Sequence, residues 1–288
     1  MAAANPGKRA LPLPYLTLVL PVVVVVVVAF VVPVLFVLVR AFTDPQVGLQ
    51  NFVWLFTESF NLELLWRTIR LGFTATVVTA LLGYPFAYLI ATSSKRVAGI
   101  LMLIVLLPFW TSMMVRTFAW IIILQPNGVL NSILGPLGVP TISLLGTQTA
   151  VLIGMCQVLM PFMVLPMASV MQSIDMRIPL AAQIFGAHPA KAFAQVYLPM
   201  SLPGVFSGTL IVFILSLGFY VTPALLGSPR EQILPNALFS QINELLNWGH
   251  GGALAWALLL TVGLVFVVVF WVARILGIKV QNIGGAQV

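Results

Sequence analysis

The segment AAQIFGAHPAKAFAQVYLPMSLPG, residues 181–204, is a short polar interruption in a chain whose flanking segments are strongly apolar. It holds Gln, His and Lys side chains, a glycine at 186 and three prolines. Apolar residues at 180, 181, 184 and 185 repeat at helical spacing, and those at 193, 196 and 197 do so again. The pattern predicts two short helices separated by a bend.

The bend is expected at Gly186, because glycine adopts positive φ at little cost and commonly ends helices. Pro189 then stands where the first residue of the second helix is expected, a position that needs no N–H donor. The sequence LPMSLPG at 198–204 is expected to end that second helix and to lead into the next apolar stretch. Neither helix is long enough to cross a bilayer, and periodicity alone leaves an interfacial hairpin as the alternative.

Composition decides the class of protein on either side of this segment. Of the 288 residues, 61% are hydrophobic and only 7% are charged, with a mean hydropathy of +1.12. Soluble domains carry about 25% charged residues, so the chain is predicted to be a polytopic membrane protein. The net charge of +7 does not indicate nucleic-acid binding, because no basic cluster with interleaved aromatic residues is present.

Six stretches reach the roughly 20 apolar residues that a helix needs to cross the hydrocarbon core. They cover residues 15–39, 69–92, 98–124, 148–172, 205–225 and 252–273. We therefore expect an all-α integral membrane protein with six transmembrane helices. Pro33 is expected to kink the first of these helices.

Basic residues predict the orientation, because cytoplasmic loops are enriched in Lys and Arg. With a cytoplasmic N-terminus, the inner side holds eight such residues: Lys8, Arg9, Lys95, Arg96, Arg177, Lys191, Arg274 and Lys279. The outer side holds five, Arg40, Arg67, Arg70, Arg116 and Arg230, together with five of the six acidic residues. Both termini are thus expected in the cytoplasm, and residues 181–204 in the second cytoplasmic loop.

The outer segments carry their own signals. Residues 42–66 show apolar residues at helical spacing and are expected to lie at the membrane interface. Residues 124–148 are uncharged and rich in glycine, which predicts a loop with one short helix. Residues 227–251 contain an amphipathic piece around Leu238 and Ile242.

The quoted segment resembles the signature loop of ABC importer permeases, which reads E-A-A, three residues, G, and later L-P followed by P-G. Ala181 and Ala182 match the two alanines and Gly186 the glycine. Two positions depart from the pattern, since Leu180 replaces the glutamate and His188 stands where serine is common. The resemblance assigns an ATPase-coupling loop to Leu180, Ala181, Ala182, Ile184, Gly186, Ala187, Pro189, Phe193, Leu198, Pro199, Pro203 and Gly204.

The resemblance extends over residues 64–275 and implies an organisation for the whole chain. We expect a cytoplasmic tail at 1–14, a first transmembrane helix at 15–40 and a permease domain of five transmembrane helices at 64–275. Within that domain the coupling loop covers 175–204, and a second cytoplasmic tail covers 276–288. The stretches VRTFAWIIILQPNGVLNSIL and LSLGFYVTPALLGSP are similar to the first permease subunit of the spermidine/putrescine branch.

In such importers the bent loop is a coupling helix that docks on a cytoplasmic ATPase. Phe193 and the apolar stripe from Leu180 to Ile184 are expected to supply the docking energy. The resemblance implies two ATPase copies, a second permease that is a distinct homologue, and a periplasmic binding protein. It also implies residence in the bacterial inner membrane and a small imported solute, a polyamine or alternatively ferric iron, an opine or another small solute.

Two other classes of function are alternatives to this one. An ion-coupled transporter would need buried acidic residues within its spans, and the six stretches contain no acidic residue. An enzyme or a metal site would need clustered catalytic or ligating residues, whereas His188 and His250 stand far apart and no G-x-x-x-x-G-K-[ST] motif occurs. We therefore expect a non-catalytic subunit without a cofactor, in which solute selectivity belongs to the binding protein.

Overall fold

A computed structural model describes residues 13–275, and this part of the chain is helical throughout its regular structure, without a strand. Six helices are long and apolar enough to cross a membrane, as expected. They are Leu20–Thr43, Ser59–Thr92, Met113–Leu137, Gln148–Gln172, Pro189–Leu217 and Trp248–Val269. The expected tail at 276–288 lies outside the described residues, as does the tail at 1–14 apart from its last two residues.

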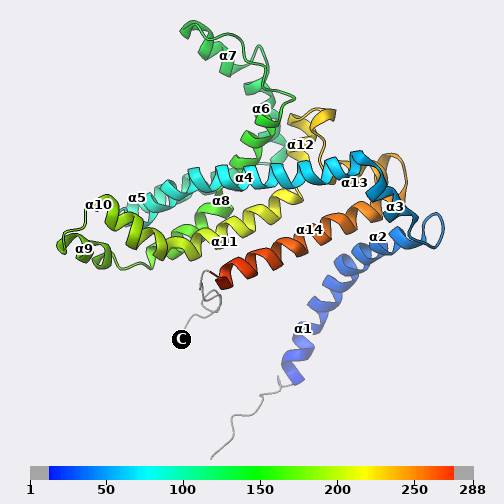
Figure 1. Ribbon diagram of the computed structural model, residues 1–288, viewed down its shortest axis with the longest axis horizontal. Helices are drawn as coiled ribbons and strands as arrows, with labels where there is room; N and C mark the ends of the chain where they lie inside the picture. Colours follow the sequence, from blue (N-terminus) through cyan, green and yellow to red (C-terminus); the bar gives the residue numbers. More distant parts are fainter. Residues whose placement is uncertain (1–12, 276–288) are drawn as a thin grey trace, which may run out of the picture.

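Three helices form the core of the bundle, α4 (Ser59–Thr92), α8 (Gln148–Gln172) and α11 (Leu198–Leu217), which run side by side in Figure 1. The central member is α8, because its buried methionines pack against both neighbours. Two glycines four residues apart allow α11 to approach closely. A Cβ at Gly208 would lie 2.9 Å from the Met163 carbonyl oxygen, and one at Gly204 would lie 2.9 Å from Val170 Cβ. Small residues at such spacing are typical of helix contacts within membranes.

The first span consists of α1 (Leu13–Val26), a π-helical turn (Val27–Val31) and α2 (Val32–Thr43). In the π turn the Val32 N–H donates to the Val27 carbonyl, five residues earlier. The turn directly precedes Pro33, whose ring would clash with an α-helical carbonyl four residues back. The expected distortion at this proline is therefore a wider turn. α2 packs along α14 (Trp248–Ile275), where Trp256 Nε1 donates to the Leu38 carbonyl at 3.0 Å.

The stretch 98–124 was expected to form a single helix, and this expectation was wrong. It is divided into α5 (Lys95–Leu106), a 3₁₀ turn (Leu107–Trp110) and α6 (Met113–Leu124). Pro108 removes an N–H from the run, Thr111 is extended and Ser112 has a non-helical backbone conformation. In Figure 1, α6 and the short α7 (Val129–Leu134) project away from the other helices.

The fifth span begins earlier than expected and includes part of the quoted segment. α10 (Pro189–Ala192), a π turn (Phe193–Tyr197) and α11 follow one another without a break. The prediction that LPMSLPG ends the second short helix was therefore wrong. As at Pro33, a π turn accommodates the proline, because the Leu198 N–H donates to the Phe193 carbonyl directly before Pro199. The span ends at Leu217, and α12 (Val221–Leu226) is a separate helix.

The segments that connect the spans on the expected outer side largely follow expectation. Residues 42–66 contain α3 (Gln50–Thr57), although α4 starts already at Ser59, ten residues before the expected span. The loop at 124–148 holds α7 and a 3₁₀ turn (Gly135–Leu137). Between α12 and α14 lie a 3₁₀ turn (Pro229–Glu231), α13 (Leu234–Phe239) and a π turn (Ser240–Glu244).

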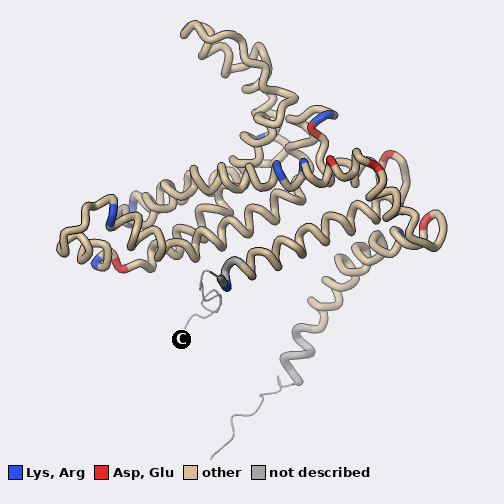
Figure 2. Tube along the Cα trace, in the orientation of Figure 1, with Lys and Arg blue, Asp and Glu red and all other residues tan. Residues whose placement is uncertain are grey.

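Basic and acidic residues are distributed unequally along the bundle. Figure 2 shows basic residues at the end that holds α9 (Arg177–Ile184) and α10, whereas most acidic residues lie toward the opposite part of the molecule. The basic end includes Lys95 and Arg96, which open α5, as well as Arg177 and Lys191. This distribution is the one that the orientation rule associates with the cytoplasmic side.

Candidate functional site

The segment quoted at the outset forms an elbow of two helices, α9 and the start of the α10–α11 rod. α9 ends in a Schellman motif, in which the Gly186 N–H donates to the Gln183 carbonyl and the Ala187 N–H to the Ala182 carbonyl. Gly186 has a φ of +91°, the left-handed conformation that L residues other than Asn and Asp seldom adopt. The bend predicted at this glycine is confirmed.

α10 starts immediately after the bend, with His188 as its N-cap and Pro189 in its first turn. His188 Nδ1 accepts a hydrogen bond from the Ala190 N–H at 3.3 Å, so the imidazole occupies the role that serine commonly has. The N–H groups of Lys191 and Ala192 both donate to the His188 carbonyl. Only Ala187 and His188 therefore separate the glycine from the second helix, and both helix ends at the elbow are hydrogen-bonded.

The tip of the elbow presents large apolar side chains to its surroundings. Phe185 is 91% exposed and Ile184 84% exposed, and Leu180 on the same helix is 54% exposed. Pro179 is the buried residue of this helix. Exposed apolar side chains that are grouped in this way are a feature of interaction sites.

Phe193 lies on the inner side of the elbow. Its ring packs edge-on against Tyr88 with centroids 5.6 Å apart and stacks with Tyr197 at 5.6 Å. Tyr88 and Tyr84 belong to α4, and the Tyr84 hydroxyl lies 2.9 Å from Ser201 Oγ on α11. The aromatic cluster thus joins the elbow to two helices of the core, and Phe193 fixes the elbow while Phe185 provides the exposed surface.

The structure brings the twelve residues of the predicted loop together in this elbow and the rod that continues it. Those that are exposed are Leu180, Ile184, Gly186, Pro189 and Pro199. Those that are partly buried are Ala181, Ala182, Ala187, Phe193, Leu198 and Pro203, and Gly204 is buried against α8. Phe185 was absent from the predicted site, although it belongs to the apolar stripe. The tyrosines of α4 were missed because their position depends on tertiary packing.

This arrangement defines a class of protein, a polytopic helical membrane protein with a rigid, apolar-tipped elbow at its basic end. A family model described as "binding-protein-dependent transport system inner membrane component" matches residues 83–282. The chain belongs to this family. It is a multi-pass inner-membrane protein, the non-catalytic permease subunit of an ABC importer, in which ATP is hydrolysed by a separate subunit.

Several curated proteins are similar to the chain over most of its length. The spermidine/putrescine transport system permease protein PotB of Haemophilus influenzae is 30% identical over 237 residues, 82% of each chain. PotB of Escherichia coli K12 is 31% identical, covering 76% of this chain and 80% of that protein. The inner membrane ABC transporter permease protein YdcU of the same organism is 29% identical, covering 68% and 67%.

Two solved structures share the fold. One is a bacterial ABC transporter involved in import of the acidic polysaccharide alginate, with a TM-score of 0.71, 18% sequence identity and coverage of 94% of this chain and 96% of that one. The other is the alginate transporter in complex with a periplasmic protein that holds an alginate pentasaccharide, with a TM-score of 0.68, 18% identity and coverage of 91% and 93%.

Proposed function

We propose that the chain is one of two permease subunits of an ABC importer for polyamines and that its elbow, residues 175–204, docks on a cytoplasmic ATPase. The observation that carries the coupling role is the exposure of Ile184 and Phe185 at the tip of a hydrogen-bonded bend. Buried against a partner, each of these side chains contributes about 1.5–3 kcal/mol. Backbone hydrogen bonds hold the chain on both sides of the bend, so a movement of the ATPase can be transmitted through the elbow to α11.

The partners follow from the same proposal. Two ATPase copies, a second permease that is a distinct homologue and a periplasmic binding protein complete the importer. Both termini and the elbow face the cytoplasm, which agrees with the basic end of the bundle in Figure 2. In this orientation solute is delivered to the end at which α3 and α13 lie (Figure 1).

A polyamine as the solute is supported by the two PotB relatives at 30% and 31% identity. Ferric iron, an opine or another small solute are the alternative cargoes.

The choice of solute is tested by transport. The complete importer, reconstituted in proteoliposomes with its ATPase and binding protein, should take up radiolabelled putrescine or spermidine only when ATP is supplied to the ATPase side. An importer whose ATPase cannot hydrolyse ATP should give no uptake. ATP-driven uptake of an opine or of chelated ferric iron, without any polyamine uptake, would refute the polyamine assignment and leave the permease role intact.

The coupling role is tested at Gly186. A β-branched residue there is strained by roughly 1–2 kcal/mol in the left-handed conformation, whereas no atom lies within 4 Å of the position that its Cβ would occupy. Gly186→Val should therefore deform the elbow without disturbing the bundle. We expect about tenfold slower uptake at normal expression, measured as initial rate per permease in the membrane.

Gly186→Asn is the matched control, because asparagine tolerates positive φ. It should retain most of the uptake. Normal uptake by Gly186→Val, or an equal loss in both variants, would contradict the role of the bend.

A further inference from the structure

A cavity of about 240 Å³ lies at the end of the bundle away from the elbow, between α12 and the α13–π turn segment. It is larger than a single water requires and smaller than a drug-sized site. Its wall is formed by residues of the stretch from Tyr220 to Glu244, which joins the fifth and sixth spans. The coupling role of the elbow does not involve this stretch.

The groups that line the cavity favour a cation. Tyr220 and Phe239 pack with ring centroids 4.8 Å apart, and both rings belong to the wall. Glu244 is the one charged residue in the lining. Aromatic faces and a carboxylate together are the groups that recognise an ammonium ion.

A buried acceptor in the same wall is without a partner. Asn236 is 7% exposed, and its Oδ1 accepts no hydrogen bond within the described part of the chain. A buried acceptor in this condition costs about 1–3 kcal/mol. The charge of the wall also discriminates between ligands, because Glu244 attracts an ammonium group and repels a carboxylate or a phosphate.

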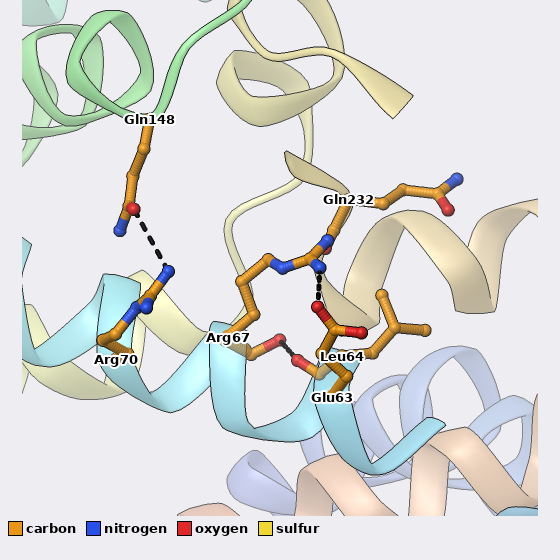
Figure 3. Close-up of polar contacts among 7 residues, drawn as sticks. Glu63, Leu64, Arg67, Arg70, Gln148 and Gln232 are labelled. Carbon is orange, nitrogen blue, oxygen red and sulfur yellow. Dashed lines mark hydrogen bonds and ion pairs between the residues drawn. The ribbon is translucent and has the colours of Figure 1, made fainter. Parts of the chain in front are cut away.

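Hydrogen bonds from α4 hold this wall in place, as Figure 3 shows in part. Arg67 Nη1 donates to the Gln232 carbonyl at 3.1 Å, and its Nη2 contacts Glu63. Two residues further along, the Leu234 N–H donates to Thr68 Oγ1 at 2.9 Å. The guanidinium of Arg67 is thus engaged by Glu63 and by the Gln232 carbonyl, and neither Arg67 nor the exposed Arg230 is among the residues that line the cavity.

We propose that this cavity is a binding subsite for a terminal ammonium group of an organic amine, between Glu244, Asn236 and the rings of Tyr220 and Phe239. The inference rests on the proposed function and deepens it, because it places part of the solute recognition on the permease. The expectation that selectivity belongs to the binding protein is then incomplete. The subsite receives the amine at the proposed outer entrance, before the amine reaches the spans.

The first test is uptake of radiolabelled putrescine by the complete importer in proteoliposomes, with the binding protein below saturation. Glu244→Gln should slow the initial rate by about tenfold and Glu244→Lys by more, whereas Glu244→Asp should keep most of the rate. Glu58→Gln is the matched control, since Glu58 is an exposed acid of the same proposed side and lies outside the cavity. It should stay within about twofold of the wild type.

Equal rates for Glu244→Gln and the wild type would overturn the subsite and leave the polyamine function standing. Equal losses in Glu244→Gln and Glu58→Gln would also overturn it, because they would indicate only a general attraction of cations. A wild-type importer that takes up no polyamine would refute the proposed function itself, and the subsite with it.

A second measurement does not depend on transport. Ser240 lines the cavity, and Ser240→Cys places a thiol there, while the native Cys156 is buried in α8. In the assembled importer a cationic methanethiosulfonate reagent should label this thiol at least about tenfold faster than an anionic reagent of similar size, and spermidine should slow the labelling. Equal labelling by both reagents, or no protection by spermidine, would contradict the subsite.

Discussion

Replacing Gly208 with leucine should lower the amount of assembled permease in the membrane several-fold. The Cβ would lie 2.9 Å from the Met163 carbonyl oxygen, and a backbone atom of α8 cannot move aside as the end of a side chain can. Over-packing of this kind costs about 1–3 kcal/mol, which lowers the ratio of folded to unfolded protein by a factor of about 5–30 or more. The measurement is the yield of detergent-extracted complex at fixed expression.

The matched control for this substitution is Gly263→Leu. Gly263 is also a helix-interior glycine, but no atom of the described chain lies within 4 Å of the position that its Cβ would take. Its yield should remain near that of the wild type. If both variants accumulate equally, the close contact between α11 and α8 does not limit assembly.

Replacing Ile184 and Phe185 together with aspartate should separate the ATPase from the permease. These two side chains are the most exposed large apolar groups of the elbow, and burying them is expected to supply about 3–6 kcal/mol of docking energy in total. Aspartates would remove that energy and bring two carboxylates into the interface. We expect co-purification of the ATPase to fall by more than about tenfold, with uptake lost at normal permease yield.

Val47→Asp controls for the cost of placing a charge at an exposed apolar position. Val47 is 87% exposed in the segment between α2 and α3, far from the elbow in sequence and on the proposed outer side. ATPase binding should be unchanged in this variant. Retention of the ATPase by the double aspartate variant would contradict the proposal that Ile184 and Phe185 form the docking surface.

The sequence predicted the elbow well because its signals are local. A glycine at positive φ and a proline in the first helical turn act within a few residues, so Gly186 and Pro189 could be placed without knowledge of the fold. The same reasoning failed at Pro199, where the chain absorbs the proline in a π turn and continues as a helix. Whether a proline ends a membrane helix or widens it depends on the packing of the flanking turns, which periodicity does not report.

The cavity near Asn236 was beyond sequence reasoning for a related reason. Tyr220 and Phe239 are nineteen positions apart in the chain, and their rings meet because the hydrogen bonds from Arg67 and Thr68 fix the path of the intervening loop. The sequence placed an amphipathic piece in this region but held no information on what it packs against. The division of the stretch 98–124 at Thr111 and Ser112 was likewise not predicted, because two small polar residues within an apolar stretch do not by themselves end a membrane helix.

The continuity of α10, its π turn and α11 has a mechanical consequence. The 29 residues from Pro189 to Leu217 form a rod about 43 Å long. The glycine crossing with α8, at Gly204 and Gly208, divides it into arms of about 25 Å and 17 Å. We infer that the crossing is a fulcrum, so that a sideways shift of the elbow reaches Leu217 reversed in direction and reduced by about a third.

Spin-label distances from each end of the rod to α4, measured with and without nucleotide in the complete importer, should therefore change in opposite senses. Changes of the same sign at both ends would rule out a pivot. With a pivot at the glycines, an ATPase that closes inward at one membrane face swings the far end of the rod outward at the other face. Alternating access would then follow from the geometry of a single lever.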